Sequence, residues 1–138
     1  MYDGFDSLAH GWSTGPVSIL TRHTLGVRPL APGYSTVLVA PQPGPVHRAE
    51  GRVPTPVGNL DVSWHREGAV FSLSLLVPDG MRAVVGIPSG QVLLHNGNTA
   101  VPEVAPASFV SAGLDVSPLL FITAGPGSHT IANGYQLR

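Results

Sequence analysis

The first part of the chain carries a helical pattern of hydrophobic and polar residues. The less polar positions recur at intervals of three and four residues, at Pro16, Ile19, Leu20 and His23. Ser13 or Thr14 is placed to cap a helix, and Gly26 is placed to end it. The pattern predicts a helix of about ten residues, with Pro16 in its first turn. Because so short a helix is marginally stable alone, it must pack against something.

After Gly26 the pattern changes to short apolar runs separated by Pro, Gly and Asn, which is typical of strands and turns. The segment 28–33 has too many prolines for a helix and is expected to be an extended linker. Strands are predicted at 35–40, 46–53, 60–65, 70–77, 82–87, 91–95, 99–101, 109–111, 119–124 and 128–131. The fold class is therefore all-β: an antiparallel β-sandwich of about eight to ten short strands, preceded by one short N-terminal helix.

Two turns and one alternation support this architecture. Asn96-Gly97 is a strong hairpin signal, and residues 66–68 are predicted to form the compact turn between two strands. In the strand 60–65, Trp64 falls on the apolar face, so it is expected in the core, whereas His65 is expected in solvent. In the strand 70–77, Phe71, Leu73, Leu75 and Val77 share one face.

Composition narrows the function classes. The 138 residues suit a single domain, and only 11% of them are charged, with a net charge of −1 and no basic run. Nucleic acid is therefore not an expected partner. No Cys is present, which excludes disulfides and thiolate metal sites. No apolar stretch approaches the roughly 18 residues of a membrane helix, so no membrane partner is expected. The first residues do not resemble a signal peptide, and the localisation stays open.

No catalytic or metal-binding motif stands out among the ionisable residues. The acids are Asp3, Asp6, Glu50, Asp61, Glu67, Asp79, Glu103 and Asp115. Of these, Glu67 and Asp79 fall in predicted turns. The histidines are His10, His23, His47, His65, His95 and His129, without the short spacing of a metal site. No Gly-x-Ser-x-Gly elbow and no phosphate-binding loop is present. We therefore expect no catalytic residue, no metal and no cofactor.

A set of motifs in fixed order resembles a known family. They are His-Gly-Trp-Ser-Thr-Gly-Pro at 10–16, Leu-Gly-Val-Arg-Pro at 25–29, Pro-Gly-Tyr at 32–34, Glu-Gly-Arg-Val-Pro-Thr-Pro-Val-Gly at 50–58 and Val-Ser-Trp at 62–64. Together they resemble the C-terminal region of the α-L-rhamnosidases of glycoside hydrolase family 78. The resemblance extends over residues 8–88. Residues 89–138 show only β character, and their role stays open.

The resemblance implies a division of the chain. In that family an (α/α)6 barrel carries catalysis and a β-sandwich follows it. Residues 1–28 resemble the end of the barrel, and residues 29–138 resemble the C-terminal β-sandwich domain. Both catalytic glutamates of the family precede the His-x-Trp-Ser motif, whereas this chain has no Glu before Glu50. The chain is therefore not expected to hydrolyse rhamnosides alone. The motif histidine, His10, and its neighbour Trp12 are the implied substrate-binding residues.

Three functions follow from this division. The first is a non-catalytic domain, accessory to a carbohydrate-active catalytic domain. A rhamnose-containing glycan would then be the ligand of the larger protein. The second is a free-standing carbohydrate-binding module in which Trp12, Tyr34 and Trp64 form a stacking surface. The third is a small interaction domain whose apolar helix face packs on its own sandwich or on another chain, for example a second copy.

Overall fold

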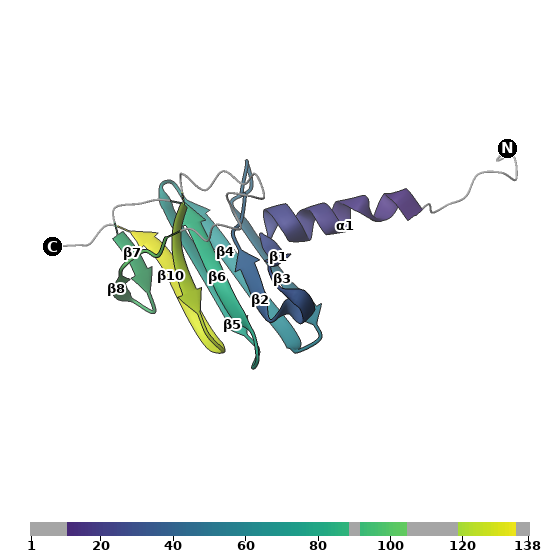
Figure 1. Ribbon diagram of the computed structural model, residues 1–138. Helices are drawn as coiled ribbons and strands as arrows, with labels where there is room; N and C mark the ends of the chain where they lie inside the picture. The colour runs from purple at the N-terminus through teal and green to yellow at the C-terminus, as the bar shows by residue number, and fades with distance from the viewer. Residues whose placement is uncertain (1–10, 89–91, 105–118, 135–138) are drawn as a thin grey trace, which may run out of the picture.

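The computed structural model describes residues 11–88, 92–104 and 119–134, and shows two packed sheets with a helical segment at the N-terminal side (Figure 1). Ten strands lie within these residues. The all-β prediction with one short N-terminal helix is therefore confirmed. The strand predicted at 109–111 lies outside the described residues.

The helical segment is longer than predicted and less regular. It consists of η1 (Gly11–Thr14), α1 (Gly15–Ile19) and η2 (Leu20–Thr24), which have 3₁₀, α and π geometry in turn. Thr14 makes no side-chain cap bond; its hydroxyl donates instead to the carbonyl of Gly11, 2.7 Å away. The segment ends where Leu25 N–H donates to the carbonyl of Leu20 over 2.8 Å. We refer to residues 11–24 as the helical segment.

The chain after the helical segment is only partly the extended linker that the prolines predict. Val27–Pro29 forms β1, which pairs with β2, so this stretch belongs to a sheet. Pro32–Tyr34 forms a short helical turn, η3, in which Gly33 and Tyr34 both have positive φ angles. Proline is tolerated in β1 because this strand lies at a sheet edge.

The first sheet has four strands, in the order β1-β2-β6-β9. Their remaining bounds are Thr36–Val39 for β2, Arg82–Pro88 for β6 and Leu119–Ala124 for β9. The pairing of β2 with β6 is parallel, whereas the other pairs in this sheet are antiparallel. The carboxylate of Glu103 accepts hydrogen bonds from the backbone N–H and the hydroxyl of Thr123, on β9, and so occupies part of this edge strand.

The second sheet has six strands, in the order β3-β4-β5-β10-β7-β8. Their bounds are Arg48–Thr55 (β3), Gly58–Glu67 (β4), Val70–Val77 (β5), Gly127–Gly134 (β10), Val92–His95 (β7) and Asn98–Ala100 (β8). Every pair in this sheet is antiparallel. The last strand in sequence, β10, therefore lies between β5 and β7.

The turns follow the sequence signals with one correction. Asn96 and Gly97 have φ angles of 51° and 78° and connect β7 to β8, as a tight hairpin requires. Asp79 lies in a turn, as predicted. The turn predicted at 66–68 lies at 68–69 instead, and Glu67 belongs to β4, where it pairs with Val70. Strand β4 extends past its predicted range of 60–65, because its backbone pairing continues beyond Trp64, its last buried residue.

The core lies between the sheets and confirms the alternation in the sequence. Phe71, Leu73, Leu75 and Val77 are buried from β5, and Trp64 is buried from β4 and stacks on Phe71 at 5.4 Å between ring centroids. A second buried cluster lies on the other face of the four-stranded sheet and includes Leu38, Ala40, Val84 and Phe121. Both faces of that sheet therefore carry buried apolar side chains, whereas the buried apolar side chains of the six-stranded sheet lie on its inner face.

Candidate functional site

The substrate-binding residues expected from the resemblance are only partly visible. His10 lies outside the described residues. Trp12 lies in η1, but the structure describes only its backbone and not its side chain. Trp64 is a core residue with 2% exposure, so it cannot contribute to a stacking surface. The hypothesis of a stacking surface formed by Trp12, Tyr34 and Trp64 is therefore wrong in including Trp64, because the alternation of β4 points the indole into the core.

Trp64 instead holds the helical segment to the sandwich. Its Nε1–H donates to the carbonyl of Thr24, the last residue of η2, over 2.9 Å. The last carbonyls of a helix have no partner within the helix, so this bond satisfies one of them. Arg28 Nε also donates to the carbonyl of Arg22 over 2.9 Å. Partial burial, and then the nearby Arg22, lower the pKa of Arg28 from its ordinary value.

The helical segment turns several polar residues toward the sandwich. A groove of about 660 Å³ lies between it and β1. The groove is lined from the helical segment by Thr14, Val17, Ser18, Thr21 and Arg22, and from the sandwich by Val27, Pro29 and Tyr34. The aliphatic residues Ile19 and Leu20 of the helical segment do not line it.

The apolar side of the helical segment is exposed. Val17, Ile19 and Leu20 are 69%, 60% and 56% exposed, and no residue of α1 or η2 is buried. Figure 1 shows the segment running out from the edge of the sheets that holds β1 and β3. Amphipathic helices normally bury this side. An apolar helix face without a cover marks a surface for another polypeptide.

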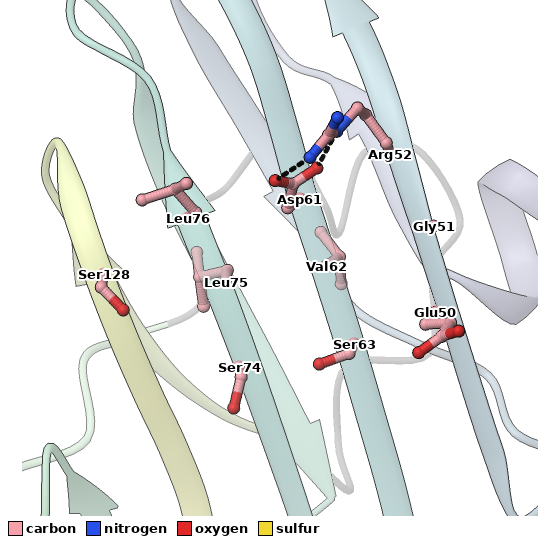
Figure 2. Close-up of a pocket in the computed structure, with 10 residues that line it drawn as sticks. All are labelled: Glu50, Gly51, Arg52, Asp61, Val62, Ser63, Ser74, Leu75, Leu76 and Ser128. Atoms are coloured by element: carbon pink, nitrogen blue, oxygen red, sulfur yellow. Dashed lines mark hydrogen bonds and ion pairs between the residues drawn. The ribbon is translucent and has the colours of Figure 1, made fainter.

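A second candidate site is a shallow hollow on the outer face of the six-stranded sheet (Figure 2), with a volume of about 640 Å³. Two rows of side chains border it across the strands. One row is Glu50, Ser63 and Ser74, and the other is Arg52, Asp61, Leu76 and Ser128. Gly51, Val62 and Leu75 form the floor, with the two side chains buried in the core. We call this site the outer hollow.

One ion pair dominates the electrostatics of the outer hollow. Arg52 Nε and Nη2 donate to the two carboxylate oxygens of Asp61, over 2.6 and 3.0 Å. This hydrogen bond lowers the pKa of Asp61 and raises that of Arg52. The bidentate pair cancels both charges and leaves Glu50 as the charged residue of the hollow that has no ion-pair partner among the described residues. Fork-like pairing also holds both side chains in one geometry.

Among the histidines that the structure describes, His95 and His129 form a pair. His95 Nε2 lies 2.9 Å from His129 Nδ1, and His129 Nε2 lies 2.9 Å from the carbonyl of Gly125. Because His129 must donate to that carbonyl, its Nδ1 accepts from His95. Within the described ranges, no three residues of the kinds that hold a metal ion come together. No helix in the described part of the chain is long and apolar enough to cross a membrane.

Sequence reasoning missed the outer hollow. Its residues come from four strands that are not all consecutive, and each is an ordinary polar position on an exposed strand face. The sequence did show polar residues at every second position, Glu50 and Arg52 in one strand and Asp61 and Ser63 in the next. That signal identifies a solvent-facing side, and the pairing register is needed to gather the residues into one place.

Comparison with known proteins extends the resemblance seen in the motifs. Residues 26–101 match the family model described as bacterial alpha-L-rhamnosidase C-terminal domain. An alpha-L-rhamnosidase of Alteromonas sp. (strain LOR) is 37% identical over 82 residues, which cover 58% of this chain and 9% of that relative. The chain therefore spans less than a tenth of the length of this relative.

Solved structures share the fold. An alpha-L-rhamnosidase from Dictyoglumus thermophilum aligns with 81% of this chain at a TM-score of 0.66 and 23% identity. One from Streptomyces avermitilis, complexed with L-rhamnose, aligns with 88% at a TM-score of 0.70 and 22% identity. The chain covers 12% and 11% of those two proteins. By the match of its residues 26–101, this chain belongs to the family of bacterial α-L-rhamnosidase C-terminal domains.

Proposed function

We propose that this domain is a non-catalytic accessory part of an α-L-rhamnosidase-like glycoside hydrolase, and that the helical segment is its attachment to the catalytic part. The observation that carries the proposal is the exposure of Val17, Ile19 and Leu20. The sandwich leaves these side chains exposed: Val17 only borders the groove on its side of the segment, and Ile19 and Leu20 do not line that groove. A partner outside this sandwich must cover them.

The proposed partner is the catalytic domain for two reasons. The matched region covers only 9–12% of the relatives of this chain, so most of each relative lies outside it. The family match begins at residue 26, immediately after the helical segment. We propose accordingly that the chain up to Thr24 belongs structurally with the preceding catalytic domain. The boundary expected after residue 28 moves earlier, because Val27–Pro29 forms β1 of the sandwich. A rhamnose-containing glycan is then the substrate of the whole assembly.

The attachment is tested with a recombinant catalytic part of a related α-L-rhamnosidase that lacks its own C-terminal domain. Binding of the 138-residue chain is measured by isothermal titration calorimetry. Replacing all three exposed apolar side chains by serine should weaken binding by roughly 100-fold, since each buried aliphatic side chain contributes about 1 kcal/mol or more. The three substitutions are Val17→Ser, Ile19→Ser and Leu20→Ser.

A matched control has three other exposed apolar residues replaced: Val46→Ser, Val57→Ser and Val70→Ser. The control should bind the catalytic part as the unchanged chain does. Equal binding by both triple variants, or no binding by the unchanged chain, would refute the attachment. Dimerisation of the free chain that is lost only in the helical variant would assign the same surface to a second copy. The chain alone should leave a chromogenic α-L-rhamnoside uncleaved.

We also propose that His10 and Trp12 contribute to the sugar pocket once the catalytic part is present. The resemblance supports this role. One imidazole supplies a hydrogen bond that matters only inside a pocket formed by other segments. In the assembled enzyme, His10→Ala should raise KM for a rhamnoside by roughly tenfold, the equivalent of one hydrogen bond of about 1.4 kcal/mol. An unchanged KM would exclude the role.

A further inference from the structure

The outer hollow gathers polar groups for which the described residues supply no partner. Among the described residues, no hydrogen bond or ion pair uses the carboxylate of Glu50 or the hydroxyls of Ser63, Ser74 and Ser128. These groups come from four strands and border one depression. Figure 2 shows them standing on the same face of the sheet, with the Arg52–Asp61 pair on the far side of the hollow from Glu50.

The Arg52–Asp61 pair adds donors and acceptors without adding net charge. The bidentate contact uses Nε and Nη2 of Arg52, so within the described chain Nη1 keeps both of its hydrogens free. Each carboxylate oxygen of Asp61 accepts one bond and retains a second lone pair. Neighbouring hydroxyl groups of a sugar need such a combination of a donor and an acceptor held at fixed positions.

Leu76 gives the same hollow an apolar element. It is 48% exposed and lies between Asp61 and Ser128 in its cross-strand row. The longer row, from Arg52 to Ser128, crosses four strands about 4.8 Å apart, so the hollow is roughly 14 Å long. It is long enough for more than one sugar ring. Apolar surface among hydrogen-bonding groups suits a ligand that presents both hydroxyls and C–H or methyl groups.

We propose that the outer hollow binds a neutral oligosaccharide, with Glu50, Ser63, Ser74 and the Arg52–Asp61 pair contacting hydroxyl groups and Leu76 contacting an apolar sugar face. The carboxylate of Glu50, which has no ion-pair partner among the described residues, disfavours anionic glycans such as polyuronates. Affinity is low, because a shallow surface encloses the sugar incompletely. The choice of a rhamnose-containing ligand rests on the proposed function. Leu76 is suited to such a ligand, because the methyl group of a 6-deoxy sugar can pack against it.

The test is a titration of the ¹⁵N-labelled 138-residue chain followed by amide chemical shifts. The probes are L-rhamnose, a neutral rhamnose-containing oligosaccharide and an oligogalacturonate as the anionic comparison. The neutral oligosaccharide should produce saturable shifts on β3, β4, β5 and β10, with a Kd of about 1 mM. The oligogalacturonate should bind at least several-fold more weakly.

Ser74→Arg fills the hollow with a long side chain and should weaken binding of the neutral oligosaccharide at least tenfold. Thr99→Arg is the matched control, because Thr99 is an exposed residue on β8 of the same sheet and does not line the hollow. Both variants are checked for unchanged amide dispersion and thermal midpoint. Glu50→Gln should reduce the discrimination against the oligogalacturonate.

Three results would overturn the proposal. They are no saturable shifts at about 20 mM neutral oligosaccharide, shifts outside the four strands, and equal binding by Ser74→Arg and Thr99→Arg. Attachment to the catalytic part is measured with a different partner and different variants. Failure of glycan binding in the outer hollow is therefore distinguishable from failure of the proposed function.

Discussion

One buried amide connects the two sheets, and its replacement gives the sharpest test of the packing described here. Asn133 is 2% exposed in β10. Its Oδ1 accepts from the N–H of Phe71, on β5, over 2.5 Å, and its Nδ2 donates to the carbonyl of Pro88, at the end of β6, over 3.0 Å. Phe71 belongs to the six-stranded sheet and Pro88 to the four-stranded sheet. A single side chain thus satisfies one backbone group in each layer.

Asn133→Leu keeps a side chain of similar size and removes both hydrogen bonds. The N–H of Phe71 is buried, so leaving it without an acceptor costs about 1–3 kcal/mol. The carbonyl of Pro88 is partly accessible and can recover some of its loss through water. The expected loss in free energy of unfolding is about 2–4 kcal/mol, a large part of the roughly 5–15 kcal/mol available to a domain. The thermal midpoint should fall by about 10 °C.

The measurement is urea unfolding at pH 7, followed by tryptophan fluorescence and circular dichroism. Asn59→Leu is the control, because Asn59 is exposed on β4; it should change the free energy of unfolding by less than about 0.5 kcal/mol. If Asn133→Leu costs no more than this control, then the Asn133 amide does not stabilise the fold through its bonds to Phe71 and Pro88.

Three further substitutions test other contacts. Gly26→Ala should prevent stable folding, because φ is +86° and the added Cβ would lie 2.3 Å from the backbone nitrogen of Pro41; thermal unfolding checks this. Trp64→Phe removes the bond to Thr24 and should cost about 1–3 kcal/mol while increasing hydrogen exchange in the helical segment. His95→Gln should flatten the pH dependence of stability. Burial, and then the neighbouring imidazole, lower the pKa of His95 from 6.5, so the unfolded chain binds more protons. Stability is therefore full above about pH 6.5 and falls below it in the unchanged chain, and unfolding at several pH values measures the difference.

The strands whose side chains alternate were the most predictable part of the fold. The bounds of β5 and β9 agree with the predicted ranges 70–77 and 119–124. Alternation gave the buried face of β5 correctly because one side of that strand packs on the core and the other meets solvent. The Asn96-Gly97 turn was equally clear, since few other dipeptides adopt two consecutive positive φ angles.

The order of the strands could not be predicted in the same way. Placing β10 between β5 and β7, and pairing β2 with β6 in parallel, depends on contacts between residues far apart in sequence. Local patterns carry no such information. The positive φ of Tyr34 also had no local signal, because a large side chain rarely adopts it.

For the helical segment, the sequence pattern predicted the apolar face correctly but did not show which neighbour that face contacts. The spacing of Pro16, Ile19 and Leu20 predicted an apolar side that needs a cover, and the structure has that side exposed. Periodicity reports which residues share a face, but it does not report which neighbour that face meets. The bond from Trp64 to Thr24, forty residues away in sequence, holds the end of the segment, and only the folded chain brings the two together.

The two proposed surfaces meet at one strand, β3. Strand β3 contributes Glu50 and Arg52 to the outer hollow, and it also contacts η2 at the base of the helical segment. Between these two residues, Gly51 accommodates Leu25, the residue that follows η2; an added Cβ would lie 2.9 Å from Leu25 Cδ2. Because β8 forms the opposite edge of the sheet, a partner bound to the helical segment lies at the β3 edge. The outer hollow begins at that same edge, so an oligosaccharide held there would lie beside the catalytic partner rather than across the sandwich from it.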